Sequence, residues 1–163
     1  MKKKIALFIT GLLMAVSANA QFEQGKMYAN AGLSGLSLSY NSNTKWNLEL
    51  SGKAGYMFQD DWMAVGDAAW GIYQETPNTF SLGAGIRYYI EQNGLYLGAG
   101  ARYKHAECYD DFMPNINIGY AFFLSRTVTV EPEIYFDMST KDIKDYSGFG
   151  LRIGFGIYLD ELF

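Results

Sequence analysis

The chain has 163 residues, of which 49% are hydrophobic and 18% are charged, and its formal net charge is −4. An acidic chain is repelled by the phosphate backbone, so this balance argues against nucleic acid as a partner. The single cysteine, Cys108, excludes an internal disulfide.

The first 20 residues have the pattern of a secretory signal peptide. Three lysines precede an apolar run from Ile5 to Val16, and small residues end the segment at Ala20. The apolar run is shorter than the roughly 20 residues that a membrane-spanning helix needs. We therefore expect cleavage after Ala20, which leaves a single domain over 21–163 with 10 basic and 17 acidic residues and a formal charge of −7.

After the leader, side-chain character alternates with a period of two. From residue 46 to residue 58, aromatic, aliphatic or small residues hold the even positions, and mostly polar residues hold the odd ones. Alternate side chains of a strand point to opposite faces, so the pattern predicts two-faced strands. The same reasoning predicts eight strands along the chain, at 27–40, 45–58, 62–73, 80–90, 95–104, 112–124, 128–138 and 147–159.

The connections between these strands alternate in length, except that 41–44 is short where a long loop is expected. Short turns at one end and longer loops at the other are typical of an outer-membrane barrel, with both termini on the periplasmic side. The predicted short turns lie at 59–61, 91–94 and 125–127, and the longer loops at 74–79, 105–111 and 139–146.

The orientation of the apolar face decides the class of protein, because a soluble lipocalin-like barrel has the same periodicity with that face turned inward. An eight-stranded barrel has an interior just wide enough for its own side chains. The apolar face carries too many rings to fit inside, and these rings fall near the two ends of the strands with aliphatic residues between them. We therefore expect a lipid-facing surface with two aromatic girdles. The rings are Trp46, Tyr56, Phe58, Trp62, Trp70, Phe80, Tyr88, Tyr103, Phe112, Tyr120, Phe122, Phe136, Phe149 and Phe155.

The opposite face combines glycine with charged residues, five of each sign. An unpaired charge in a dry interior costs several kcal/mol, so a balanced set predicts ion pairs inside the barrel. We interpret the set as a structural network that plugs the lumen, because eight strands leave little room for an aqueous bore. A narrow or gated pore lined by the same charges is the alternative. The ten residues are Glu49, Lys53, Asp67, Arg87, Arg102, Lys104, Glu131, Glu133, Asp137 and Arg152.

Some pairs within this set follow from the predicted turns. If the first short turn closes at residues 59–61, Lys53 lies across from Asp67, which could also reach Arg87 on its other side. Arg152 is expected beside Glu133 in the last hairpin.

The last strand ends in a pattern that resembles the terminal phenylalanine of outer-membrane barrels, which the barrel-insertion machinery recognises. Phe163 follows Phe155, Ile157 and Leu159 in one phase, and Glu161 departs from the apolar residue that is usual there. With its leader, eight strands and two girdles, the chain is similar to the small outer-membrane β-barrel family that includes OmpX and the membrane domain of OmpA. The resemblance implies an all-β, eight-stranded, antiparallel up-and-down barrel in a Gram-negative outer membrane, without a peptidoglycan-binding domain.

Enzymes that modify lipid A also occur on this scaffold, and they need a histidine near a nucleophile and an acid. His105, the only histidine, has no serine or threonine within its predicted loop to act as the nucleophile. Cys108 has no basic residue to activate it apart from His105. A mixed metal site of His105, Glu107, Asp110 and Asp111 is a further alternative. We interpret the segment as a solvated loop and expect no catalytic residue, metal or cofactor.

Two local irregularities are predicted. Pro132 points outward in the middle of a strand, where it deletes a ladder hydrogen bond, so we expect a bulge or bend there. The apolar phase also changes within 27–40, which predicts a bulge at Gly35.

The sequence therefore predicts a monomeric, non-enzymatic outer-membrane barrel with a structural or surface-interaction role. Its expected partners are outer-membrane lipid, lipopolysaccharide and the insertion machinery, with surface partners contacted through 105–111 and 139–146.

The signal-peptide assignment gives a direct test. The protein isolated from the outer membrane should begin at Gln21 when its intact mass and N-terminal peptides are measured by mass spectrometry, because small residues precede the predicted cleavage site. Recovery of protein that still carries the three leader lysines would contradict the assignment.

Overall fold

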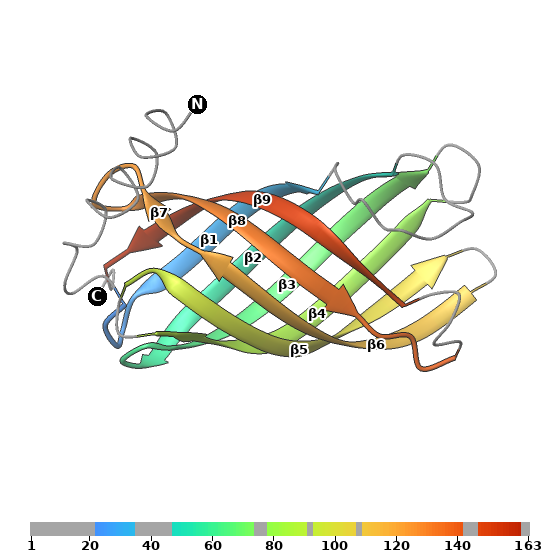
Figure 1. The fold of residues 1–163 in the computed structure, drawn as a ribbon, viewed down its shortest axis with the longest axis horizontal. Helices are drawn as coiled ribbons and strands as arrows, with labels where there is room; N and C mark the ends of the chain where they lie inside the picture. Colours follow the sequence, from blue (N-terminus) through green and yellow to red (C-terminus); the bar gives the residue numbers. More distant parts are fainter. Residues whose placement is uncertain are drawn as a thin grey trace, which may run out of the picture.

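A computed structural model of the protein describes residues 22–34, 47–73, 78–90, 93–106, 109–141 and 147–160. No helix in these ranges is long and apolar enough to cross a membrane. Their secondary structure consists of β1 (Met27–Ser34), β2 (Asn47–Gln59), β3 (Trp62–Tyr73), β4 (Thr79–Tyr89), β5 (Leu95–Ala106), β6 (Tyr109–Tyr120), β7 (Phe122–Phe123), β8 (Val128–Asp137) and β9 (Gly148–Leu159) (Figure 1).

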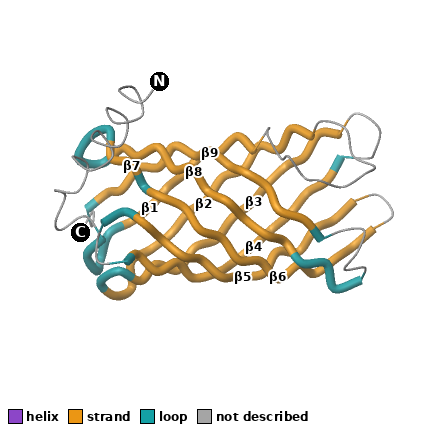
Figure 2. The backbone as a smooth tube through the Cα atoms, in the orientation of Figure 1, coloured by secondary structure: helices purple, strands orange, loops and turns teal. Residues whose placement is uncertain are grey.

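The strands form one antiparallel sheet that closes on itself. Each strand pairs with its neighbours in the order β6-β5-β4-β3-β2-β1-β9-β8-β7, and β6 also pairs with β8. The two-residue β7 keeps the register of β6 against β8, since Gly119 pairs with Glu133 and Phe122 with Val130. β6 and β7 are thus two parts of one interrupted strand of the wall. Because they count as one strand, the predicted eight-stranded up-and-down barrel is confirmed (Figure 2).

The interruption between β6 and β7 lies opposite Pro132. This residue pairs in register with Ile153 on β9, but the ladder toward β6 stops at Glu133 and resumes at Val130. Proline has no N–H to donate to Tyr120, which the shared register places across from it. Of the predicted bulge or bend, the bulge is therefore wrong: the ladder is broken there while its register is unchanged.

Strand boundaries also correct one predicted loop. β5 continues to Ala106 and β6 begins at Tyr109, so most of the predicted 105–111 loop is strand. The alternation therefore extends into the hairpin, and Asp110 and Asp111 point to opposite faces of the wall. The leader, Gly35, Trp46 and Phe163 lie outside the described residues.

The faces of the wall are oriented as the sequence predicts. Ile116 and Phe155 point outward with 61% and 56% of their surface exposed, whereas Ser51 and Arg152 point inward with 2% and 4% exposed. A surface of exposed aliphatic and aromatic side chains suits lipid and contradicts the lipocalin-like alternative. Among the described side chains, aromatic pairs lie toward both ends of the barrel: Trp62–Tyr88 and Tyr120–Phe122 toward the short turns, and Trp70–Phe80 toward the long loops.

Glycine allows the backbones of β4 and β5 to approach closely. Gly85 pairs with Gly100, and a Cβ built on either residue would lie 2.9 Å from the Cα of the other and 2.6 Å from a backbone oxygen. Backbone atoms cannot yield as a side chain can, so these positions require glycine.

This close approach predicts a difference between two glycines of the same sheet. Gly100→Ala should lower the free energy of unfolding by about 1–3 kcal/mol, as overpacking typically does. Gly66→Ala is the matched control, because its Cβ would meet nothing nearer than 3.9 Å. Urea unfolding in detergent micelles measures both, and equal stability of the two variants would contradict the close-approach argument.

Candidate functional site

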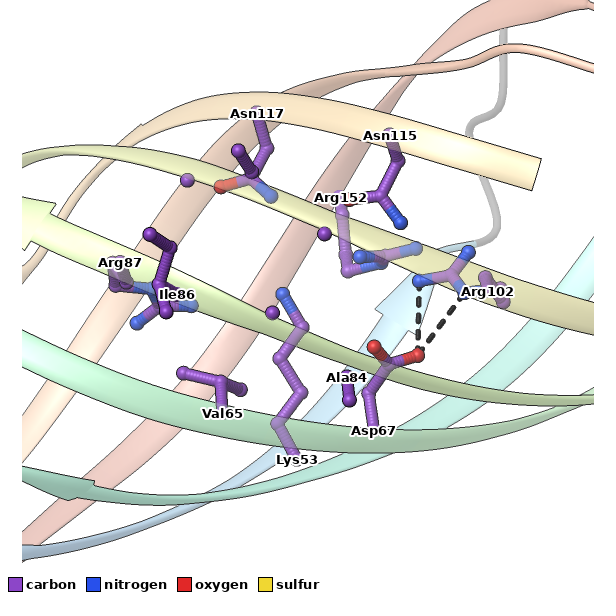
Figure 3. A pocket seen from close by; sticks show the side chains of 14 residues that line it. Lys53, Val65, Asp67, Ala84, Ile86, Arg87, Arg102, Asn115, Asn117 and Arg152 are labelled. Carbon is purple, nitrogen blue, oxygen red and sulfur yellow. Dashed lines mark hydrogen bonds and ion pairs between the residues drawn. The ribbon is translucent and has the colours of Figure 1, made fainter.

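The candidate site is the charged interior of the barrel. The ten inner-face residues predicted above all point away from lipid, and Figure 3 shows several of them extending into the lumen from different strands. Two carboxylates on β8, Glu131 and Glu133, organise the contacts among them.

Glu133 lies at the centre of the more extensive cluster, with 2% of its side chain exposed. Its two oxygens accept hydrogen bonds from Lys53 Nζ at 2.9 and 2.8 Å. Arg152 Nη1 donates to it at 2.8 Å, and the Tyr96 hydroxyl at 3.1 Å. Arg87 Nη2 lies 3.5 Å away. One carboxylate therefore links β2, β4, β5 and β9 to β8.

Glu131 lies two residues closer to the short turns and is bound mainly by hydroxyl groups. The Tyr28 hydroxyl donates to Oε2 at 2.5 Å, and Thr129 and Tyr158 donate to Oε1 at 2.8 and 3.1 Å. These neutral donors satisfy a buried carboxylate without adding further cations.

Arg87 connects the two carboxylates. Its Nη1 donates to Glu131 at 3.2 Å, while its Nη2 faces Glu133. The guanidinium carbon lies 3.9 Å from the centre of the Tyr96 ring and 5.1 Å from that of Tyr28. Ring faces attract a guanidinium, so the cation is stabilised by both carboxylates and rings.

A second group of ion pairs lies nearer the long loops. Arg102 donates from Nε to Asp67 at 3.1 Å and its Nη2 lies 3.0 Å from the same carboxylate. Its Nη1 lies 3.5 Å from Asp137, and Arg152 Nη2 lies 3.6 Å from Glu49. Arg152 thus takes part in both groups.

The predicted strand register is confirmed, but only some of the ion pairs expected from it form. Lys53 and Asp67 are Cα partners, as are Glu133 and Arg152. Arg152 binds Glu133 as expected. The other expectation is wrong: Lys53 turns to Glu133, 80 residues away, and Asp67 is paired with Arg102 instead of Arg87. Long side chains cross the lumen, so pairing within one ladder does not determine ionic partners.

A small cavity lies among these charges. Its volume is about 30 Å³, and Lys53, Arg102, Asn117 and Arg152 are among the side chains around it (Figure 3). Within the described residues, Nε of Arg152 and Oδ1 of Asn117 are buried without a hydrogen-bond partner. The space could hold about two water molecules, one per 10–15 Å³.

The structure describes three of the four alternative metal ligands at the long-loop rim and does not bring these three together, while Glu107 and the neighbouring Cys108 lie outside the described residues. His105 Nδ1 and Asp110 Oδ1 form an exposed pair at 2.5 Å on the outer face. Asp111 is instead buried on the inner face, where the hydroxyls of Ser139 and Thr140 donate to it at 2.5 and 3.0 Å. Asp110 and Asp111 are adjacent in a strand, so they point to opposite faces. Among the described residues, no group of three or more His, Cys, Asp or Glu side chains could hold a metal ion.

The sequence reasoning missed the filling of the short-turn end. Phe22, which precedes β1, lies buried there with Tyr28, Met57, Met63 and Tyr158, among others. The alternation of side chains along the strands places the tyrosines on the inward face. It gives no signal for Phe22, because Phe22 belongs to no strand.

Family comparison agrees with this architecture. Residues 6–163 match the model of the outer membrane protein beta-barrel domain. The chain belongs to this family. The protein is therefore a small barrel of the outer membrane, and the apolar wall described above is the surface that faces lipid.

Solved structures with the same fold include three bacterial barrels. The N-terminal β-barrel domain of Pseudomonas aeruginosa OprF aligns with a TM-score of 0.63 at 14% identity, covering 83% of this chain and 98% of that one. OprG of the same organism gives a TM-score of 0.59 at 13% identity, covering 85% and 97%. Ail, the attachment invasion locus protein of Yersinia pestis, gives 0.55 at 15% identity, covering 83% and 99%. A search of curated protein sequences gave no match.

The central position of Glu133 gives a stability prediction. Glu133→Gln keeps the shape of the side chain but leaves Lys53 and Arg152 without their main counter-charge, so the free energy of unfolding should fall by about 3–5 kcal/mol. Asp160→Asn is the control: its carboxylate is largely exposed and lies 3.6 Å from Lys26, so a change below about 1 kcal/mol is expected. Similar urea midpoints for the two variants would contradict the central role of Glu133.

Proposed function

We propose that this outer-membrane barrel is a non-enzymatic structural protein whose lumen is closed by its ionic network, and that residues at its long-loop end contact surface partners. The observation that supports closure is the set of contacts on Glu133, which joins cations from β2, β4 and β9 across the lumen. A route for hydrated ions would have to separate these groups, and breaking a buried ion pair is costly.

The wall of the barrel fills and stabilises the membrane, and the residues at the long-loop rim contact surface partners. We take the protein to be a monomer in contact with outer-membrane lipid and lipopolysaccharide, exported with a leader that is removed after Ala20. At the long-loop end, Thr140 and Lys141 are exposed, and the segment 142–146, which supplies more charge, lies outside the described residues. Loops held on a rigid wall are common sites of recognition.

The narrow or gated pore is the second candidate, because a small cavity lies beside Lys53 and Arg152 within the charged interior. Planar-bilayer recording separates the two. Closure predicts a silent membrane for the wild type, whereas steady ohmic steps of large conductance would refute it. Glu133→Gln serves as the comparison, since loosening the network should make any conductance more frequent.

The non-enzymatic role has its own test. A lipid-modifying activity needs a histidine, and His105, the only one in the sequence, lies on the exposed outer face with Asp110 as its hydrogen-bond partner. We expect mass spectra of lipid A to be the same in cells that express the wild type, the His105→Ala variant or no protein. Lipid A that is modified only in the presence of the wild type would overturn the proposal.

A further inference from the structure

Residues 22–25 occupy the short-turn mouth of the barrel without belonging to its wall. They precede β1 and are part of no strand. Even so, Phe22 is among the most buried residues of the described chain, with 1% of its surface exposed. A side chain from outside the sheet therefore fills the end of the lumen.

The Phe22 ring is held by aromatic contacts. It stacks on Tyr89 with 3.9 Å between ring centres and 17° between planes. It also meets Phe123 and Tyr158 edge to face, each with 5.6 Å between centres. Stacked and edge-to-face arrangements are the favourable geometries for such rings. Rings from three strands, β4, β7 and β9, thus surround this one ring.

Three backbone contacts hold the segment around this ring. Asp61 N donates to the Phe22 carbonyl at 2.9 Å, and Gly25 N donates to the Met57 carbonyl at 2.8 Å. Gln24 N donates to Asp60 Oδ1 at 2.9 Å. The segment is therefore fastened chiefly to the turn between β2 and β3.

Phe22 separates the mouth from the ionic network. The hydroxyls of Tyr89 and Tyr158, the tyrosines that it contacts, lie 2.7 Å apart. Tyr158 donates to Glu131, and Arg87 donates to Tyr89. Loss of the Phe22 ring would thin the barrier between the mouth and the buried charges, leaving this tyrosine layer and the neighbouring Met57 and Met63.

We propose that residues 22–25 are a detachable stopper, which controls the access of water from the short-turn mouth to the tyrosine layer. Its release breaks the three hydrogen bonds given above and the ring contacts, but it opens no strand ladder among the described residues. Displacing any wall residue would instead break the pairing of a strand, and segments that can open with few bonds broken are the ones that open locally.

The turn that holds the stopper contains a residue with an unusual backbone angle and an unpaired oxygen atom, Asp61. Asp61 has a φ of 65°, in the left-handed region that costs a side-chain-bearing residue energy. Its Oδ1 is buried without a hydrogen-bond partner in the described structure. Burial, and then the neighbouring charge of Asp60, raises the pKa of this carboxyl. Asp61 thus adds a local energetic cost to the turn that holds the segment.

Hydrogen exchange on the wild type tests the stopper directly. In protein purified from the outer membrane, the amides of Gly25 and Asp61 should exchange at least about a hundredfold faster than amides inside the β2–β3 ladder, without response to low denaturant. Exchange at the rate of the ladder, with the same denaturant dependence, would refute the inference.

Thiol accessibility gives the matched test of access. In a Cys108→Ser background, a thiol introduced by Met63→Cys lies in the cluster around Phe22, and one introduced by Met113→Cys lies toward the long-loop end. Adding Phe22→Ala should speed the reaction of the first thiol with a membrane-impermeant reagent at least about tenfold and leave the second unchanged. An unchanged rate at position 63 would refute the stopper, and equal acceleration at both positions would show general loosening instead. The bilayer test of the network is independent, because the stopper closes only one mouth.

Discussion

The structure depends on one electrostatic constraint: charges enclosed by a lipid-facing wall must be neutralised inside the lumen. Glu133 meets Lys53 and Arg152, while Glu131 is bound mostly by hydroxyls. Solvent cannot screen these groups as it would at a surface. The stability gained from each ion pair therefore depends on the distance and orientation of its groups. The contacts also cross between strands that share no ladder, and they therefore hold together the closed form of the sheet.

Most of the architecture follows from the sequence because a lipid-facing barrel imposes a strict period of two. Leu50, Ile116 and Ile153 alternate with small or polar residues, and each is exposed on the outer face. Register follows as well wherever a short turn fixes it, as for Lys53 and Asp67. Such information is local, since it requires only neighbouring strands and the turn between them.

The remaining features depend on distances across the lumen, which a linear pattern does not contain. The Lys53–Glu133 pair joins residues 80 positions apart through long side chains, and the insertion of Phe22 depends on a space that exists only after closure. The effect of Pro132 also needed the neighbouring strand, because a lost donor can produce either a bulge or a gap. Asp111 shows a similar limit, since its burial follows from a strand that continues further than its polar sequence suggests.

The interior is also unequal around its circumference. On β4 and β5 the inward positions include Gly83, Gly85, Gly98 and Gly100, and carboxylate or amide groups from neighbouring strands occupy the space over Gly83 and Gly98. The carboxylates that bind the most cations lie instead on β8. An engineer who wished to widen the lumen would gain nothing at these four glycine positions, which already carry no side chain. Widening would have to begin on β8, where shortening a single residue releases several cations at once.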